Sequence, residues 1–391
     1  MFRIQTMNSI AAEGLYLFSA DKYEVGPGTA DPDAILLRSA DLRKVSIPQS
    51  VLAIVRAGAG YNNIPVEECS ERGIVVFNTP GANANAVKEL TLAALFLSSR
   101  KISDSIRWLL SLKDGASAGG DVSALVEKEK SRFEGPEISG KTLGVVGLGS
   151  IGVMVANDAA ALGMDVIGYD PYISVNAAWN LSRSVRHAET IEDVLRNSDY
   201  VSIHVPYSDA TKDMLSADKI RIMKKGARLL NFARGGLAKE ADVISALESG
   251  RLSVYITDFP TVELLKNDKV ICIPHLGAST PEAEINCAIC AVKQAKNFLE
   301  NGVIENSVNF PSCRLSRNSP YRLLAANRNI PNMVGQITTL LAAGGINITD
   351  LINHHRDGYA YNIIDTEQEI PASILAALQN IPGIIRVRTI A

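Results

Sequence analysis

Short apolar runs alternate with stretches of helical spacing along most of this chain. In the first hundred residues, the runs at 34–38, 52–56 and 74–77 are rich in aliphatic side chains, and polar or glycine-containing turns follow them. Buried parallel strands have this pattern. Residues 85 to about 112 have the spacing of one long helix. Residues 113–136 are rich in Gly, Ser, Lys and Glu and lack that period, which predicts a loop or a solvated helix near a domain boundary.

From Lys141 onward the alternation of strand-like and helical segments is regular. It predicts a parallel, doubly wound sheet of the Rossmann type, in which ligands bind at the carboxyl ends of the strands. The expected strands are 142–147, 165–169, 200–205, 228–232, 253–257 and 270–273.

The last part of the chain has a different pattern. An amphipathic helix over 281–302 is followed by a polar linker, and residues 321–391 are long enough for a small α+β domain. Their pattern of strand, helix, two strands, helix and strand predicts a βαββαβ order. The sequence therefore predicts two α/β regions and a separate C-terminal domain.

Composition narrows the class of protein. The chain has 391 residues, of which 47% are hydrophobic and 21% charged, and its formal net charge is −3. A balance this close to neutral, without a basic block, argues against nucleic acid as the main partner. No apolar run is long enough for a membrane span. The N-terminal residues lack the features of a signal peptide, so we expect a cytoplasmic protein. The five cysteines have no framework or zinc spacing, and we expect buried thiols and no metal.

A glycine motif follows the strand expected at 142–147 and opens a helix. Gly147, Gly149 and Gly152 form G-x-G-x-x-G, which lets the backbone approach a pyrophosphate at the helix N-terminus. Asp170 ends the next strand, where a carboxylate binds the ribose hydroxyls and repels a 2′-phosphate, so NAD is favoured over NADP. We expect further cofactor contacts from residues beside this motif and at later strand ends: Ser150, Ile151, His204, Val205, Pro206, Thr211, Phe232, Ala233, Asp258, Gly277 and Ala278.

Three later residues have the chemistry of hydroxy-acid oxidation. Arg234 directly follows a predicted strand, and its planar guanidinium matches a carboxylate. Glu263 and His275 come after it in that order. A histidine near its ordinary pKa can accept a hydroxyl proton, and a carboxylate partner fixes its tautomer. The order Arg, Glu, His after a dinucleotide-binding motif in the sequence predicts hydride transfer between a nicotinamide cofactor and a small hydroxy acid.

Residues 1–313 closely resemble the D-2-hydroxyacid dehydrogenase family. The matching segments are Arg56-Ala-Gly-Ala-Gly-Tyr-Asn-Asn, Asn78-Thr-Pro-Gly, the run 140–152, Asn231-Phe-Ala-Arg-Gly-Gly and Pro274-His-Leu-Gly-Ala-Ser-Thr. The resemblance implies that Arg234 binds substrate and that Glu263 and His275 do the acid/base work. It also implies a flavodoxin-like substrate domain that is discontinuous (1–98 and 274–313), an inserted NAD-binding domain (99–273), a linker (314–320) and a C-terminal domain (321–391).

The C-terminal segment resembles an ACT regulatory domain. A dehydrogenase of this family joined to one ACT domain implies oxidation of 3-phosphoglycerate to 3-phosphohydroxypyruvate, the first step of serine synthesis. Effector contacts would come from Asn327, Asn329 and Asn347. Asn327 stands where the serine-sensing motif has His, and Asn332 where it has Gly, so serine inhibition stays open.

The same resemblance implies the residues that hold the substrate. These are Arg38, Arg56, Ala57, Gly58 and Asn78. For each arginine, phosphate binding is weighed against a structural ion pair. Lys88, where the family usually has Ala, is either a further substrate-side cation or a solvated helix charge.

Two other functions are considered. One is a different enzyme of the same family, such as a glycerate/hydroxypyruvate reductase or a D-lactate dehydrogenase, which typically lacks the ACT segment. The other is a dinucleotide-sensing corepressor similar to the C-terminal-binding proteins. Those proteins have a disordered tail, whereas the C-terminal segment of this chain has the hydrophobic period of a folded domain. The family's pairing of nucleotide domains implies a homodimer or homotetramer.

Overall fold

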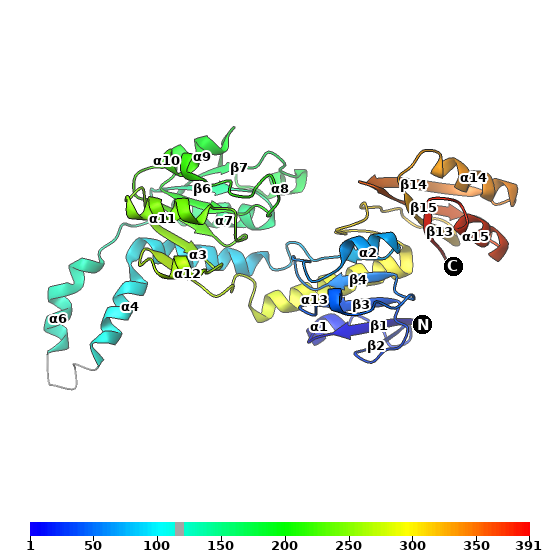
Figure 1. The fold of residues 1–391 in the computed structure, drawn as a ribbon, viewed down its shortest axis with the longest axis horizontal. Helices are drawn as coiled ribbons and strands as arrows, with labels where there is room; N and C mark the ends of the chain where they lie inside the picture. The colour runs from blue at the N-terminus through cyan, green and yellow to red at the C-terminus, as the bar shows by residue number, and fades with distance from the viewer. Residues whose placement is uncertain (114–120) are drawn as a thin grey trace. The chain divides into compact units, whose positions relative to one another are not determined.

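The computed structural model describes residues 1–113 and 121–391, which form three β-sheets (Figure 1). They divide into two compact units, one of residues 1–83 with 281–391 and the other of residues 84–280. Two sheets are parallel and one is antiparallel, so the predicted fold class is confirmed. No helix in the described ranges is long and apolar enough to cross a membrane.

The first sheet of unit 1 is parallel, with the strand order β2-β1-β3-β4-β5 typical of flavodoxin-like folds. Its strands are β1 (Phe2–Met7), β2 (Tyr23–Gly26), β3 (Ala34–Leu37), β4 (Ala53–Arg56) and β5 (Val75–Phe77). The strands β3, β4 and β5 are buried along nearly their whole length, which explains their continuous apolar sequence.

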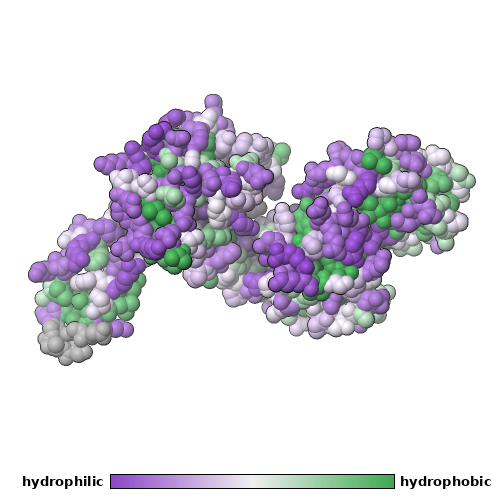
Figure 2. Space-filling model, in the orientation of Figure 1, coloured by the Kyte–Doolittle hydropathy of each residue, from purple (hydrophilic) through white to green (hydrophobic). Residues whose placement is uncertain are grey.

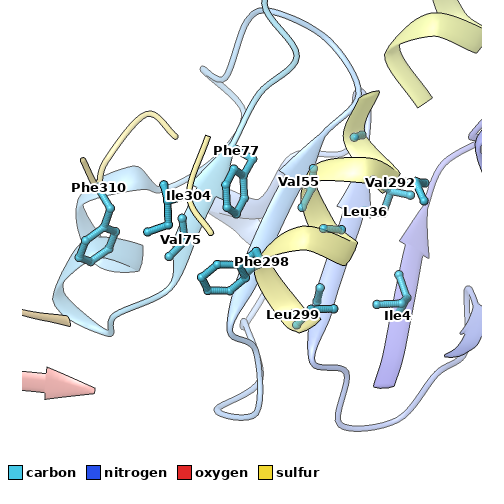
Figure 3. Packing of buried hydrophobic residues seen from close by; sticks show 14 of the residues in the cluster. Ile4, Leu36, Val55, Val75, Phe77, Val292, Phe298, Leu299, Ile304 and Phe310 are labelled. Carbon is cyan, nitrogen blue, oxygen red and sulfur yellow. The ribbon is translucent and has the colours of Figure 1, made fainter. Parts of the chain in front are cut away.

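A long helix returns to cover this sheet. Helix α13 (Pro281–Asn301) supplies Val292, Phe298 and Leu299 to the core, facing residues of the strands (Figure 3). The rings of Phe77 and Phe298 meet edge to face at 5.5 Å. The shorter helices of this region are α1 (Ala12–Leu15) and α2 (Val66–Glu71).

Unit 2 contains a seven-stranded parallel sheet of order β12-β11-β10-β9-β6-β7-β8. The order reverses between β6 and β9, which is where such sheets bind dinucleotides. The strands are β6 (Thr142–Val146), β7 (Asp165–Tyr169), β8 (Arg186–His187), β9 (Tyr200–Ile203), β10 (Ala227–Asn231), β11 (Leu252–Thr257) and β12 (Val270–Cys272). The helices are α3 (Ala84–Arg100), α4 (Ile102–Ser111), α6 (Val122–Glu129), α7 (Ser150–Ala161), α8 (Val175–Asn180), α9 (Ile191–Asn197), α10 (Ala217–Arg221), α11 (Glu240–Glu248) and α12 (Val262–Leu265).

The single long helix expected over residues 85–112 is wrong. Lys101 adopts the left-handed conformation, with φ of 47°, and divides it into α3 and α4. Part of the segment 113–136 is helical, because it contains α6. Asp121 caps this helix by accepting a hydrogen bond from the backbone N–H of Ala124. The rest of that prediction, at 114–120, falls outside the described residues.

Helices α4 and α6 expose an unusual amount of apolar surface, visible as green patches in Figure 2. The exposed apolar residues are Ile102, Ile106, Leu109 and Leu110 of α4 and Val122 and Leu125 of α6. Exposed apolar residues that gather on neighbouring helices are typical of a surface that contacts another protein, and we call these six residues the apolar stripe.

The C-terminal part of unit 1 has the predicted βαββαβ order. Its elements are β13 (Tyr321–Arg328), α14 (Met333–Ala343), β14 (Ile348–Arg356), β15 (Tyr359–Thr366), α15 (Ala372–Gln379) and β16 (Ile384–Ile390), and the antiparallel sheet has the order β14-β15-β13-β16. Both faces of β13 are buried. Leu323 and Ala325 pack with the helices, whereas Leu324 and Ala326 join the core that contains Phe298.

Polar side chains of the C-terminal sheet bind carbonyls at the C-terminal end of α13 and at Gly302, which directly follows it. Arg322 donates to the carbonyl of Asn301 at 2.8 Å, Arg388 to that of Leu299 at 3.1 Å, and the Tyr361 hydroxyl to that of Gly302 at 3.0 Å. A helix leaves its last carbonyls without partners in its own chain, and cations there also interact favourably with the helix dipole. We call these three residues the α13 clamp.

Candidate active site

The glycine motif forms a tight turn between β6 and α7. Gly147 has a φ of 93°, and a Cβ on Gly152 would lie 1.9 Å from the carbonyl oxygen of Gly147. A Cβ on Gly149 would meet nothing within 4 Å. The turn therefore needs glycine at Gly147 and Gly152 for its own packing, whereas Gly149 leaves open space beside the start of the helix. Ser150 and Ile151 are the first residues of α7.

Asp170 lies next to this turn. One carboxylate oxygen accepts the backbone N–H of Leu148 at 2.8 Å, and the other accepts that of Tyr172 at 2.9 Å. The carboxylate is thereby fixed beside the glycine turn, one strand away from β6. An open cradle at Gly149 and a fixed carboxylate fit the pyrophosphate and ribose of NAD, and the same negative charge disfavours the 2′-phosphate of NADP.

His204 follows β9 and interacts with the preceding strand through its ring. Its Nε2 lies 2.8 Å from the hydroxyl of Ser202, and burial lowers the pKa of His204 to about 4. The imidazole is therefore neutral at physiological pH. Val205 and Pro206 come next, and the Thr211 hydroxyl donates to the carbonyl of Pro206 at 2.7 Å.

The loop after β10 carries Arg234. Asn231, which is 1% exposed, donates to the carbonyl of Arg234 at 2.9 Å and accepts the N–H of Ala233 at 3.2 Å. Arg234 is exposed and donates to the carbonyl of Ala233. Phe232 is buried at the start of the loop. Asn231 thus holds the conformation of the loop through these hydrogen bonds. This role was not expected from the sequence, and the only sequence signal for it is the position of Asn231 in the segment Asn231-Phe-Ala-Arg-Gly-Gly.

Asp258 directly follows β11, beside the segment that carries His275. It is 1% exposed, accepts the N–H of Gly277 at 3.2 Å, and its backbone carbonyl accepts the N–H of His275 at 3.1 Å. Burial raises the pKa of Asp258, while the N–H of Gly277 and the charges of His275 and Arg234 oppose the rise. The buried carboxylate is therefore under the influence of two of the three expected catalytic residues, Arg234 and His275. Ala278 follows directly.

The expected pairing of Glu263 with His275 is not formed. Glu263 stands in the first turn of α12, and its carboxylate accepts a hydrogen bond from Lys266 at 2.6 Å. The two residues are three apart on one helix, so their side chains are natural neighbours. The His275 ring lies 5.0 Å from that of Phe259. The catalytic roles of Glu263 and His275 stay predictions.

Unit 1 carries the expected phosphate-binding residues. Leu37 of β3 is paired with Arg56 of β4, so Arg38 and Arg56 lie at the carboxyl ends of adjacent strands. The Arg56 guanidinium lies against Gly58, where a Cβ would come within 2.5 Å of Nη1. Arg38 forms an ion pair with Glu284 at 2.5 Å.

The loop that follows β4 is held by backbone and side-chain hydrogen bonds. Ala57 is buried, the N–H of Gly58 donates to the Thr79 hydroxyl at 2.7 Å, and Asn78 donates to the carbonyl of Ala59 at 2.6 Å. Lys88, in unit 2, pairs with Asp158 of α7 at 2.8 Å, so this cation has a structural partner.

The three expected effector residues differ in their surroundings. Asn327 is 1% exposed, accepts a hydrogen bond from Asn362 at 2.7 Å and donates to the carbonyl of Arg328. Its amide is thereby hydrogen-bonded within the sheet, and the expected ligand contact stays a prediction. Asn329 and Asn347 are exposed. The substitution at Asn332 has a backbone explanation, since its φ of 66° suits Asn next best after Gly.

The strand order of unit 2, with its glycine turn and strand-end carboxylate, defines a dinucleotide-binding protein of the Rossmann class. The family model described as "D-isomer specific 2-hydroxyacid dehydrogenase, NAD binding domain" matches residues 93–277, which supports the predicted cofactor, NAD. A D-3-phosphoglycerate dehydrogenase of Methanocaldococcus jannaschii is 36% identical over 334 residues, covering 82% of this chain and 60% of the relative. A hydroxypyruvate reductase of Thermotoga maritima is 35% identical, covering 69% of this chain and 85% of the relative.

Among solved structures, the NAD⁺-bound 3-phosphoglycerate dehydrogenase of Entamoeba histolytica is similar with a TM-score of 0.61 and 27% identity. The similarity covers 79% of this chain and 98% of that one. The chain belongs to the D-isomer specific 2-hydroxyacid dehydrogenase family. It spans about three fifths of the length of the M. jannaschii relative.

Proposed function

We propose that this protein oxidises 3-phosphoglycerate at C2 to 3-phosphohydroxypyruvate with NAD, the first step of serine synthesis. The observation that carries the proposal is the pair of arginines, Arg38 and Arg56, at the ends of adjacent strands of unit 1. A substrate with a phosphate as well as a carboxylate needs more positive charge than Arg234 alone. The similarity to D-3-phosphoglycerate dehydrogenases over most of the chain supports the same substrate.

The chemistry follows from the residues of unit 2. Gly149 and Asp170 would hold NAD, which when bound supplies the acceptor for the C2 hydride. Arg234 would bind the substrate carboxylate through its planar guanidinium. His275 would accept the C2 hydroxyl proton, so that the electron pair of the O–H bond forms the new carbonyl as the hydride leaves. Holding both groups against the substrate would supply much of the rate.

A second function of the same family, reduction of hydroxypyruvate to glycerate, is favoured by one observation. Arg38 is already paired with Glu284, which lessens the charge available for a phosphate. The T. maritima relative, named a hydroxypyruvate reductase, is consistent with it.

Initial rates of NAD reduction decide between the two functions. They should be measured with 3-phosphoglycerate, D-glycerate and D-lactate at alkaline pH with a carbonyl trap, because the oxidation is uphill. A strong preference for 3-phosphoglycerate is expected. Turnover of D-glycerate without any of 3-phosphoglycerate would reverse the assignment. Repeating the series with millimolar L-serine tests whether the C-terminal sheet is a serine-sensing ACT domain.

The apolar stripe on α4 and α6 supports the proposal that the chain is a homodimer or homotetramer. Six exposed apolar side chains on two neighbouring helices are costly to leave in water. Sedimentation analysis of the wild type and of Leu109→Glu should show a smaller assembly for the variant. An unchanged mass would place the contact elsewhere.

A further inference from the structure

Glu284 is a carboxylate in direct contact with an arginine of the expected phosphate site. It lies in the first turn of α13, and its Oε1 is 2.5 Å from Nη1 of Arg38. The side chains of Arg38 and Glu284 are 36% and 46% exposed. A bound anion could therefore reach the guanidinium from solvent, and the carboxylate has room to turn away.

The surroundings of this ion pair belong to the same site. Arg38 follows β3, and the paired strand β4 ends at Arg56. Cys287, three residues after Glu284 on α13, is close enough to both arginines and to Glu284 for all three to influence its thiol pKa, which burial raises. The first turns of α13 and the ends of two strands therefore converge, and Glu284 brings a negative charge to a cluster that otherwise has two positive ones.

We propose that Glu284 is a specificity-determining residue, which binds Arg38 in the absence of substrate and must be displaced by the substrate's phosphate. The inference rests on the proposed function, because it takes the phosphate of 3-phosphoglycerate as the competing anion. The carboxylate and the incoming phosphate compete for the same guanidinium donors of Arg38. A substrate that lacks the phosphate does not need Arg38 and is unaffected.

The size of the effect follows from the exposure of the pair. Half-exposed ion pairs are weak, and their strength corresponds to a factor of roughly two to five in an equilibrium constant. Glu284→Gln keeps the shape of the side chain and removes its charge. We expect this variant to bind 3-phosphoglycerate roughly two to five times more tightly, with kcat unchanged and with KM for D-glycerate unchanged.

Binding should be measured by calorimetry on the full chain loaded with NADH, where 3-phosphoglycerate cannot be oxidised. This keeps the result independent of turnover. If the wild type fails to oxidise 3-phosphoglycerate but Glu284→Gln still tightens its binding, the proposed function falls and the role of Glu284 stands. If 3-phosphoglycerate is a good substrate and its Kd is unchanged or raised in the variant, the role of Glu284 is overturned and the function stands.

Two further variants complete the experiment. Glu305→Gln removes a carboxylate of equal exposure that pairs with Arg314 at 3.3 Å, and it should leave the Kd unchanged. In an Arg38→Ala background, Glu284→Gln should no longer tighten binding, since a double-mutant cycle isolates the coupling of the pair. The same gain with and without Arg38 would contradict displacement and indicate a general effect of charge.

Discussion

The buried ion pair of the C-terminal sheet gives the sharpest prediction on stability. Arg322 and Asp365 are both 0% exposed, and the guanidinium donates to the two carboxylate oxygens at 2.6 and 2.8 Å. Arg322→Met would leave Asp365 buried without its partner, which costs about 3–5 kcal/mol. Arg322→Met would also remove the hydrogen bond that Arg322, a member of the α13 clamp, donates to the carbonyl of Asn301. This loss lowers the free energy of unfolding by about 1 kcal/mol more.

The double variant Arg322→Met with Asp365→Leu removes both charges and fills the space with apolar groups. Such replacements are often neutral or stabilising, so most of the lost stability should return. If the single variant lost less than about 1 kcal/mol, or if the double variant were no more stable than the single one, the reasoning from desolvation would be refuted.

The assay can separate the two units. Both tryptophans, Trp108 and Trp179, lie in unit 2, whereas the ion pair is in unit 1. In urea titrations we expect the far-UV circular dichroism of Arg322→Met to show an earlier transition. The tryptophan fluorescence transition should stay near its wild-type midpoint. A matched shift of both signals would mean that the units unfold together.

Three other changes test the nucleotide site. Gly152→Ala should weaken NADH binding at least tenfold in a fluorescence titration, because its Cβ would lie 1.9 Å from the Gly147 carbonyl oxygen, and normal affinity would contradict this packing. Asp170→Ala should lower the ratio of kcat/KM for NAD over NADP at least tenfold, measured with both cofactors; an unchanged ratio would remove Asp170 from cofactor selection. Burial lowers the pKa of His204 to about 4, so the folded state binds this proton less readily than the unfolded state does. The contribution of neutral His204 to the free energy of unfolding is therefore fully present above the ordinary pKa of 6.5. It falls by up to about 3 kcal/mol as the pH drops to 4. Urea titrations across this pH range should show that the free energy of unfolding depends less on pH in His204→Gln than in the wild type. The same pH dependence in both proteins would argue against a lowered pKa of His204.

The fold was largely predictable because its signals are local. The turn at Gly147 and the strand before it are adjacent in sequence, and Asp170 follows at the distance set by one helix and one strand. The break at Lys101 was missed, because a left-handed lysine leaves no mark in the hydrophobic period.

The details of the site depend on contacts that no local pattern contains. Arg38 and Glu284 are far apart in sequence, so their ion pair could not be read from either segment. Glu263 was expected to face a distant histidine, but a lysine three residues away is its partner in the structure. Asn327 was expected at an effector site because its position matches the ACT motif, whereas its hydrogen bond to Asn362 depends on the neighbouring strand.

A contact between the two chain segments of unit 1, residues 1–83 and 281–391, has a consequence for the synthesis of the protein. Arg386 donates to the carbonyl of Val51, which precedes it by 335 residues. At translation rates of about 5–20 residues per second, the segment that contains Val51 waits roughly 20 to 70 s for this partner. During that time unit 2, whose residues are contiguous, can emerge and fold. The sheet that contains β4 is therefore completed after unit 2, and a ribosome that stalled before Arg386 would hold a chain with a folded unit 2 and an unfinished unit 1.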